Sequence, residues 1–511
     1  MQENLISRIF SLFIVSFLLL FSSSWGRVLV LVFFSISIWI EVPHAIFYGN
    51  WANPISLFLL SENFSEVWTT IRDVDWKVIF ISILFIFSSL AFFLWFFAWI
   101  SDIKGQHVVS CLILAGFLVQ PIKDGIFLAD EIEKRFTKSV DGFFENSLNT
   151  YGVFTSLLVQ QVVGKQKYPF YNHEPHPLKD SVDRAKVNIL IYFGESLSSR
   201  YMSLFGYHKP TTPSLSGIKD KYQHTLTREA IAGSMATNVS TARFFHMIPY
   251  PDGRQQVASS KTNLFKYAKE AGFHTAYFTT QAKRYIGHIM SVTGGNYVQT
   301  SITPHEYDQA NYGFTDFADD ILLFEMLDKF EPQEPYFTVL QPVGSHVHFK
   351  NRSPPAFKKF GTNDYRLEYE NSIFYTDHIL DSLLEGLARK KSELPWVFIA
   401  TSDHGTYVNK GIISREDKYA ESYSVPLIIV TNDTGIYNEF IAPLGQCGTI
   451  FHQQIAETIA NILGYEVPMS PCNQGVLNSD ILSGVGRTHR VVINNSSPIL
   501  TPYTGEFEPG K

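Results

Sequence analysis

The sequence predicts two parts of different architecture: a transmembrane helical region over residues 1–130, and an α/β domain with a mostly parallel, helix-flanked sheet over residues 186–511. Three observations support this division. Long apolar runs gather in the first part. Short β-rich apolar runs alternate with helical patterns in the second. Only 17% of the 511 residues are charged, compared with about 25% in an average soluble protein. Residues 131–185 are predicted to be a linker between the two parts.

The first 130 residues contain four apolar runs of the kind that cross membranes. They are residues 5–24, 28–42, 78–100 and 107–119. The third run has no charged residue in 23 positions, and a helix needs roughly 20 apolar residues to span the hydrocarbon core. A cleaved signal peptide would explain only the first run, and no small-residue cleavage site follows it. We therefore expect a multi-pass membrane protein, and whether residues 47–60 hold part of a fifth span stays open.

The linker prediction rests on composition. Residues 165–180 read KQKYPFYNHEPHPLKD, which is rich in proline, histidine and charge and has no apolar period. From Val187 onward the composition is that of a soluble globular domain, long enough to build one large core.

Strand and helix patterns alternate through this domain. The predicted strands are residues 187–193, 275–280, 336–342, 396–401 and 425–431, and the predicted helices are residues 263–272, 319–330, 369–391 and 451–463. Continuous apolar strands are typical of sheets that are buried on both faces, and the alternation favours a mostly parallel sheet between helices. Ligands of such folds bind beyond the carboxyl ends of the strands. The residues that follow each strand are therefore candidates for chemistry.

Three predicted strands end in side chains that can bind a metal. Glu195 follows the strand at 187–193, Asp403 and His404 follow the strand at 396–401, and His346 follows the strand at 336–342. Carboxylate oxygens and imidazole nitrogens suit Zn²⁺ or a similar divalent ion. Each residue alone could equally be a helix cap or a solvated loop residue. Their coincidence at three strand ends favours a metal site.

The segment at residues 230–244, AIAGSMATNVSTARF, is a candidate for the reacting group. Gly233, Ser234, Thr237 and Ser240 suggest a loop that enters a helix, and a helix N-terminus offers N–H groups and a positive dipole end to a phosphate. A metal-bound serine or threonine there could attack phosphorus. The segment alone is also compatible with an ordinary helix cap.

Composition excludes several classes of protein. A net charge of −7 argues against a general nucleic-acid binder. Three cysteines in the whole chain are too few for a disulfide scaffold or a four-cysteine zinc module.

Four stretches carry a resemblance to one enzyme family: NILIYFGESLSSRYMSLFGYHKPTTPSL at 188–215, GSHVHF at 344–349, YENSIFYTDHIL at 369–380 and SDHG at 402–405. They resemble the bacterial membrane-bound phosphoethanolamine transferases of the alkaline phosphatase and sulfatase superfamily. The resemblance covers about residues 186–432. It implies a sulfatase-like catalytic domain in the periplasm, carried by the bacterial inner membrane.

The resemblance also implies roles for individual residues. Glu195, Thr237, Asp403 and His404 would bind one Zn²⁺, with a second ion left open, and Thr237 would be the nucleophile. His346 and Lys283 would lie near the transferred phosphate. Asn63, Glu66, Ser240 and His348 are weaker candidates for substrate contacts, the first two because they match an N-x-x-E element of the family.

The sequence departs from the family at three places. GSMAT has one residue more than the family pattern before its threonine, so Ser234 competes with Thr237 as the nucleophile. A second histidine that is usual after D-H-G is missing, with Arg415 roughly in its place and His348 as an alternative. The family's cysteine pairs are absent, and whether Cys447 and Cys472 pair stays open.

The expected activity is the transfer of phosphoethanolamine from phosphatidylethanolamine to an envelope acceptor, through a covalent phospho-threonine. The acceptor would be a hydroxyl or phosphate of lipid A, a core sugar or a glycan, so membrane lipids are expected partners and nucleic acid is not. A phosphoglycerol transferase and a non-catalytic membrane sensor remain alternatives. The C/S-x-P-x-R stretch that forms the formylglycine of sulfatases is missing, which argues strongly against sulfatase activity.

Overall fold

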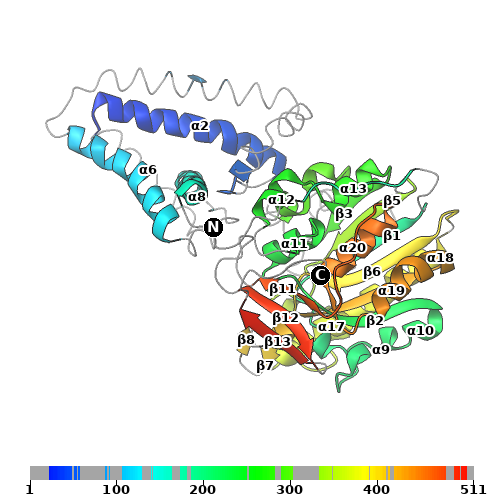
Figure 1. Ribbon diagram of the computed structural model, residues 1–511. Coiled ribbons are helices and arrows are strands. Elements are labelled where there is room, and N and C mark those ends of the chain that lie inside the picture. Colours follow the sequence, from blue (N-terminus) through cyan, green and yellow to red (C-terminus); the bar gives the residue numbers. More distant parts are fainter. Residues whose placement is uncertain are drawn as a thin grey trace. The chain divides into compact units, whose positions relative to one another are not determined.

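A computed structural model of the chain has two compact units, each described here by itself (Figure 1). The first comprises residues 1–167 with 284–291, and the second comprises residues 168–283 with 292–511. The structure describes residues 22–48, 51–54, 56–57, 84, 87–88, 91, 106–128, 140, 142–163, 173–180, 186–249, 253–281, 289–302, 333–347, 349–390, 392–409, 412–414, 419–478, 488–494 and 497–502.

The described part of the first unit contains two helices that are long and apolar enough to cross a membrane. They are α2 (Ser24–Tyr48), over its stretch Ser24–Val42, and α6 (Gln106–Phe127). They correspond to the second and fourth apolar runs of the sequence. The first and third runs lie largely outside the described residues, and of the possible fifth span at 47–60 only residues 47–48, 51–54 and 56–57 are described.

The predicted linker contains a third helix, α8 (Phe143–Val163). Its Asn146 side chain donates to Glu41 Oε1 at 2.9 Å and to the Ala52 carbonyl at 2.7 Å, so α8 packs inside the first unit. The boundary between the compact units therefore falls after residue 167 rather than after 130. Hydropathy does not reveal α8, because asparagine, serine, threonine and glutamine dilute its apolar residues.

The second unit is built on an eight-stranded sheet of order β10-β2-β9-β6-β1-β5-β3-β4. Its strands are β1 (Asn188–Gly194), β2 (His224–Ile231), β3 (His274–Thr279), β4 (Thr300–Ile302), β5 (Tyr336–Gln341), β6 (Trp396–Ser402), β9 (Ser424–Thr431) and β10 (Ile450–Phe451). β9 runs antiparallel to β2 and β6, and the other neighbours in the sheet are parallel. All five predicted strands are present, which confirms the predicted mostly parallel sheet.

Helices cover both faces of this sheet (Figure 1). The main ones are α11 (Thr237–Phe245), α12 (Arg254–Ser259), α13 (Leu264–Glu270), α17 (Tyr365–Arg389) and α20 (His452–Ile462), with short helices α9 (Pro213–Ser216), α10 (Ile218–Lys221), α18 (Thr434–Ile436) and α19 (Ala442–Gly445). Three predicted helices match α13, α17 and α20, and the fourth, 319–330, lies outside the described residues.

The pleat of β1 shows how the sheet separates its two cores. Successive side chains of a strand point to opposite faces. Tyr192 packs in the cluster that contains the apolar face of α17, whereas the ring of Phe193 contacts Phe244 and Phe245 of α11 on the other face. Apolar side chains on both faces thus hold β1 and its carboxyl end in a fixed position.

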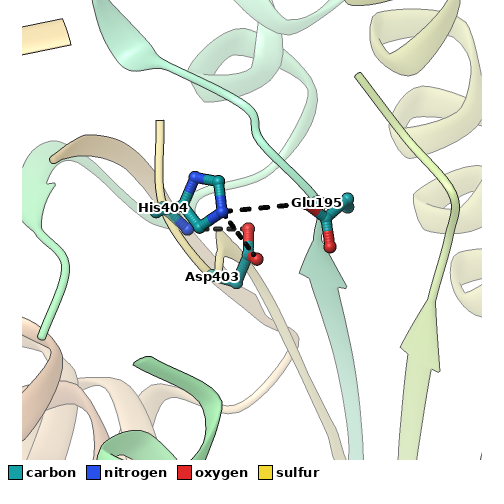
Figure 2. Close-up of side chains that lie close together, drawn as sticks. All are labelled: Glu195, Asp403 and His404. Carbon is teal, nitrogen blue, oxygen red and sulfur yellow. Dashed lines mark hydrogen bonds and ion pairs between the residues drawn. The ribbon is translucent and has the colours of Figure 1, made fainter. Parts of the chain in front are cut away.

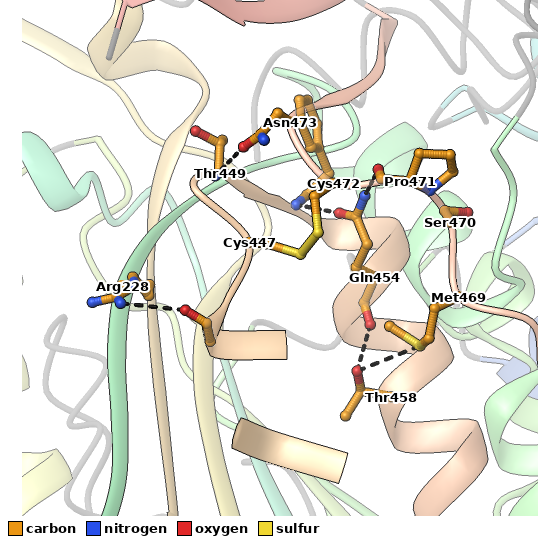
Figure 3. Close-up of a disulfide and its surroundings, with 12 residues drawn as sticks. Arg228, Cys447, Thr449, Gln454, Thr458, Met469, Ser470, Pro471, Cys472 and Asn473 are labelled. Carbon is orange, nitrogen blue, oxygen red and sulfur yellow. Dashed lines mark hydrogen bonds between the residues drawn. A yellow bond between two sulfur atoms is a disulfide. The ribbon is translucent and has the colours of Figure 1, made fainter. Parts of the chain in front are cut away.

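A disulfide joins Cys447 to Cys472, 25 positions apart in the sequence (Figure 3). Gln454, in the first turn of α20, donates to the Pro471 carbonyl at 2.8 Å and ties the chain beside Cys472 to the helix. The pairing that the sequence left open is therefore present. The remaining strands form a hairpin of β7 (Tyr407–Asn409) and β8 (Ile412–Ser414), and a small antiparallel sheet of β11 (Gln474–Asn478), β12 (Thr488–Asn494) and β13 (Ser497–Pro502).

Candidate metal centre

Glu195 lies at the carboxyl end of β1, in a tight turn between two other strand ends. Ser345, after β5, donates its N–H to the Glu195 carbonyl at 3.0 Å. The neighbouring Gly344 has φ +55°, and a Cβ there would lie 2.9 Å from the Glu195 carbonyl oxygen. Only glycine suits this conformation and this close approach. The loop after β5 therefore fixes the backbone that carries Glu195.

Asp403 and His404 follow β6, and their side chains lie beside that of Glu195 (Figure 2). Asp403 Oδ1 accepts from the N–H groups of Ser196 at 2.9 Å and His404 at 2.7 Å. The other carboxylate oxygen, Oδ2, lies 3.3 Å from His404 Nε2. Because the backbone N–H groups hold Oδ1, the carboxylate is oriented with Oδ2 toward the imidazole.

The tautomer of His404 follows from its second nitrogen. Nδ1 lies 2.7 Å from the Gly405 carbonyl oxygen. A carbonyl can only accept, so Nδ1 carries the proton and Nε2 keeps its lone pair. Nε2 faces both carboxylates, at 3.3 Å from Asp403 and 3.8 Å from Glu195 Oε1. A histidine whose Nδ1 donates to a backbone carbonyl is oriented as metal ligands usually are.

The hydroxyl of Thr237, the first residue of α11, joins this cluster. Its Oγ1 lies 3.4 Å from each Glu195 carboxylate oxygen and 3.3 Å from His404 Nε2. Ser234 lies elsewhere: it is fully buried, and its Oγ accepts from the Ala236 N–H at 3.2 Å. The two candidate nucleophiles therefore have different surroundings, and Thr237 is the one at the metal-binding groups.

The donor set fits a zinc ion. Zinc bound tetrahedrally at 2.0–2.2 Å sets neighbouring ligand atoms about 3.3 Å apart. The His404–Asp403, Thr237–Glu195 and Thr237–His404 distances are all 3.3–3.4 Å. Glu195, Asp403 and His404 are at most 2% exposed, and their ligand atoms lie within 4.8 Å of one another. Two buried carboxylates are costly without a cation, so a divalent ion suits this site.

Two other predicted site residues lie around the cluster. His346 is half-buried, and its Nδ1 lies 2.6 Å from the Val347 carbonyl oxygen; it is not in the group whose ligand atoms converge. Ser240 is fully buried, and its hydroxyl donates to the Asp403 carbonyl. Ser240 therefore contacts the backbone behind the site instead of open space where a substrate could bind.

Five of the residues singled out in the sequence fall outside the described part of the chain. They are Asn63, Glu66, Lys283, His348 and Arg415.

One residue next to the centre, His452, was not predicted from the sequence. It directly follows the strand β10, just as Glu195 and Asp403 follow β1 and β6. β10 has only two residues, too short to show as a strand in the hydropathy pattern. Burial lowers the pKa of His452 to about 4, so its imidazole is neutral at physiological pH.

The sequence matches one family model and several curated proteins. A family model described as Sulfatase matches residues 187–465. The Kdo(2)-lipid A phosphoethanolamine 7''-transferase of Salmonella typhimurium is 23% identical over 319 residues, 56% of this chain and 53% of that protein. The phosphoethanolamine transferase EptC of Escherichia coli O18:K1:H7 is 24% identical over 371 residues, 64% of this chain and 60% of that protein. The chain thus spans between half and two thirds of the length of these curated relatives.

Solved structures with a similar chain course include two such transferases. The periplasmic domain of EptC from Escherichia coli, in complex with Zn, has a TM-score of 0.49 at 16% identity and covers 65% of this chain and 96% of that one. The integral membrane protein EptA from Neisseria meningitidis has a TM-score of 0.47 at 15% identity and covers 86% of this chain and 85% of that one. The family match and the curated relatives confirm the resemblance seen in the sequence.

Proposed function

The chain belongs to the sulfatase family, and on that premise we propose that it is a metal-dependent phosphoethanolamine transferase that uses Thr237 as its nucleophile. The observation that carries this proposal is the position of the Thr237 hydroxyl, within 3.4 Å of both Glu195 and His404. The curated relatives support the transferred group, since their names describe phosphoethanolamine transferases.

The residues of the cluster would divide the work as follows. Glu195, Thr237, Asp403 and His404 would hold a zinc ion, which supplies Lewis-acid stabilisation for the negative charge of the reacting phosphate. Thr237 is the first residue of a nine-residue helix, so a phosphate that reaches its hydroxyl lies at the positive end of the α11 dipole.

We propose two displacements at phosphorus. In the first, Thr237 Oγ1 bonds to the phosphorus of phosphatidylethanolamine while the bond to the glycerol oxygen breaks. Diacylglycerol leaves with the electron pair and takes up the proton that Thr237 loses. In the second, an acceptor oxygen bonds to the phosphorus of the phosphoethanolamine on Thr237 while the bond to Thr237 Oγ1 breaks, and Thr237 takes up the proton that the acceptor loses. Two displacements through one residue predict ping-pong kinetics.

The proposed location is the bacterial inner membrane, with several spans and residues 186–511 in the periplasm. The apolar helices α2 and α6 support membrane attachment. The Cys447–Cys472 disulfide supports an oxidising compartment for the catalytic domain. A membrane anchor would raise the effective concentration of a lipid donor, and the acceptor would be a lipid or glycan of the envelope.

Peptide mass spectrometry tests the proposal directly. The full-length protein, loaded with zinc, is incubated with vesicles of phosphatidylethanolamine or of phosphatidylglycerol and digested with trypsin. The peptide 229–243 carries both Thr237 and Ser234, and fragment ions distinguish them. We expect a phosphoethanolamine mass on Thr237. An adduct from phosphatidylglycerol alone would indicate a phosphoglycerol transferase, and an adduct on Ser234 would reject Thr237.

A further inference from the structure

His452 lies behind the metal centre, in a position that connects the segments that form it. It is 2% exposed and is the first residue of α20. The strand before it, β10, pairs with β2, and Phe451 lies opposite Ile231. The chain of β2 continues from Ile231 through Gly233 to Thr237. His452 therefore lies next to the loop that leads from β2 to Thr237.

The first contact of His452 is with that loop. The Gly233 N–H donates to His452 Nδ1 at 3.3 Å. A backbone N–H can only donate, so Nδ1 is an acceptor and the proton of the neutral ring is on Nε2. Gly233 precedes Thr237 by four residues, so this hydrogen bond holds the loop on the N-terminal side of the nucleophile.

The second contact reaches the metal-binding segment through Ser240. Ser240 lies on α11, one turn after Thr237, and its Oγ is 3.3 Å from His452 Nδ1. The single hydrogen of this hydroxyl is donated to the Asp403 carbonyl, so Ser240 packs against the unprotonated Nδ1 without a hydrogen bond to it. His452 and Ser240 together therefore bridge the loop before Thr237, the helix after it, and the segment that carries Asp403 and His404.

Two neighbouring aromatic rings pack against the imidazole. Its centroid lies 6.1 Å from that of Phe193 and 5.2 Å from that of Phe244. Phe193 belongs to β1, two residues before Glu195, and Phe244 belongs to α11. The strand that carries Glu195 and the helix that carries Thr237 thus each have a residue in contact with His452.

We infer that His452 is a positioning residue, which sets Thr237 against the segment of Asp403 and His404. A metal or catalytic constellation works only when its groups are held within about 0.5 Å by the residues around them. His452 would not touch the reacting atoms. It would position Thr237 through Nδ1, which accepts the hydrogen bond from the Gly233 N–H. This inference rests on the proposed role of the Thr237 cluster.

The test compares two side chains of nearly equal shape at position 452. His452→Asn keeps an acceptor oxygen where Nδ1 lies, whereas His452→Leu removes it. The zinc affinity of the full-length protein is measured by competition with a chelator, and kcat and KM for phosphatidylethanolamine are measured separately. We expect His452→Leu to lose about 10–100-fold in zinc affinity and in kcat, the usual cost of losing an outer partner of a metal site. KM should change little, and His452→Asn should stay within a few-fold of the wild type.

His246→Leu is the matched control. His246 is also buried, but its Nε2 lies 3.2 Å from the Asn263 side chain and not at the metal centre. This variant should lower the melting temperature and leave zinc affinity unchanged. If His452→Leu does not fold, His452→Asn is compared with His452→Gln, whose carbonyl lies one bond further out, and the Asn variant should bind zinc more tightly.

Several outcomes would overturn the inference. They are wild-type zinc affinity in His452→Leu, equal affinity of the Asn variant and its Leu or Gln counterpart, or an equal loss of zinc in His246→Leu. Zinc binding is measured without substrate. A wild-type protein that binds zinc but transfers nothing would therefore count against the proposed function, while the zinc comparison would still decide the role of His452.

Discussion

Two regions of the second unit differ in what offsets the charge of their buried carboxylates. On α17, the fully buried Glu370 accepts from the Tyr207 hydroxyl at 2.5 Å and from Lys209 Nζ at 2.7 Å. At the metal centre, Glu195 and Asp403 share a cluster in which only His404 could carry a positive charge. A carboxylate with its own lysine holds the fold together. Two carboxylates with one imidazole between them suit a cation that arrives from outside.

Removal of the proposed nucleophile should give the largest effect. Thr237→Ala removes the oxygen proposed to attack phosphorus but leaves Glu195, Asp403 and His404 in place. We expect turnover to fall by at least ~10³-fold with the fold preserved, and Thr237→Ser to retain a little activity. Ser234→Ala removes the acceptor of the Ala236 N–H and should cost about 1 kcal/mol of stability, while turnover stays nearly intact. Near-normal transfer by Thr237→Ala would remove Thr237 from the mechanism.

At Asp403, the comparison predicts that one substitution lowers zinc affinity and raises the stability of the metal-free protein. Asp403→Asn keeps an oxygen for the Ser196 and His404 N–H groups but removes one of two buried negative charges. Zinc affinity should fall by more than about 100-fold, beyond the loss of an outer partner. The metal-free protein should melt at a higher temperature than the metal-free wild type. Melting curves in chelator decide this, and a lower temperature would show that Asp403 is structural.

Lys209→Met should lower the stability of the fold and leave zinc affinity unchanged. It leaves Glu370 buried without its closest cation, although Arg366 Nε stays 3.6 Å away. We expect a loss of about 1–3 kcal/mol in the free energy of unfolding, less than for a pair without a second cation. Zinc affinity, measured as for Asp403→Asn, should not change. A loss of zinc in this variant would mean that the two regions are coupled.

A third buried carboxylate gives an effect that depends on pH. Burial raises the pKa of Glu457 on α20 from 4.5 to about 7, although Ser470 and Gln453 donate to it. The folded state keeps a proton that the unfolded state loses between pH 4.5 and 7, so stability falls as the pH rises through this range. The loss is at most about 3 kcal/mol. Denaturant titrations should show a flatter pH dependence for Glu457→Gln, and an unchanged slope would refute this.

The strand ends were predictable because their signal is local. β1 and β6 are continuous apolar runs, so the polar residues after them mark both the end of each strand and the edge of the sheet. Glu195, Asp403 and His404 could therefore be assigned to one site from the order of residues alone. Thr237 could not be assigned in this way, since a serine- and threonine-rich loop is typical of many helix starts. Its role came from the family resemblance.

The composition of the sequence did not predict α8, in which apolar and uncharged polar side chains are mixed. α8 was taken as part of a linker, because its polar side chains conceal its contacts with Glu41 and Ala52. Only the tertiary structure shows that these side chains find partners in the same compact unit. Only the tertiary structure likewise shows that Ser240, a weaker candidate for a substrate contact, donates to the backbone of Asp403.

Local patterns were enough to specify the elements whose physical signal is contained in a few neighbouring residues: the apolar helices, the buried strands and the metal-binding side chains that follow them. Tertiary packing determined what depends on distant segments. It set Thr237 rather than Ser234 beside Glu195, joined Cys447 to Cys472, and brought His452 into contact with Gly233 and Ser240. These contacts join residues far apart in the chain. No local pattern records them, because they form only when the faces of the sheet and its helices pack together.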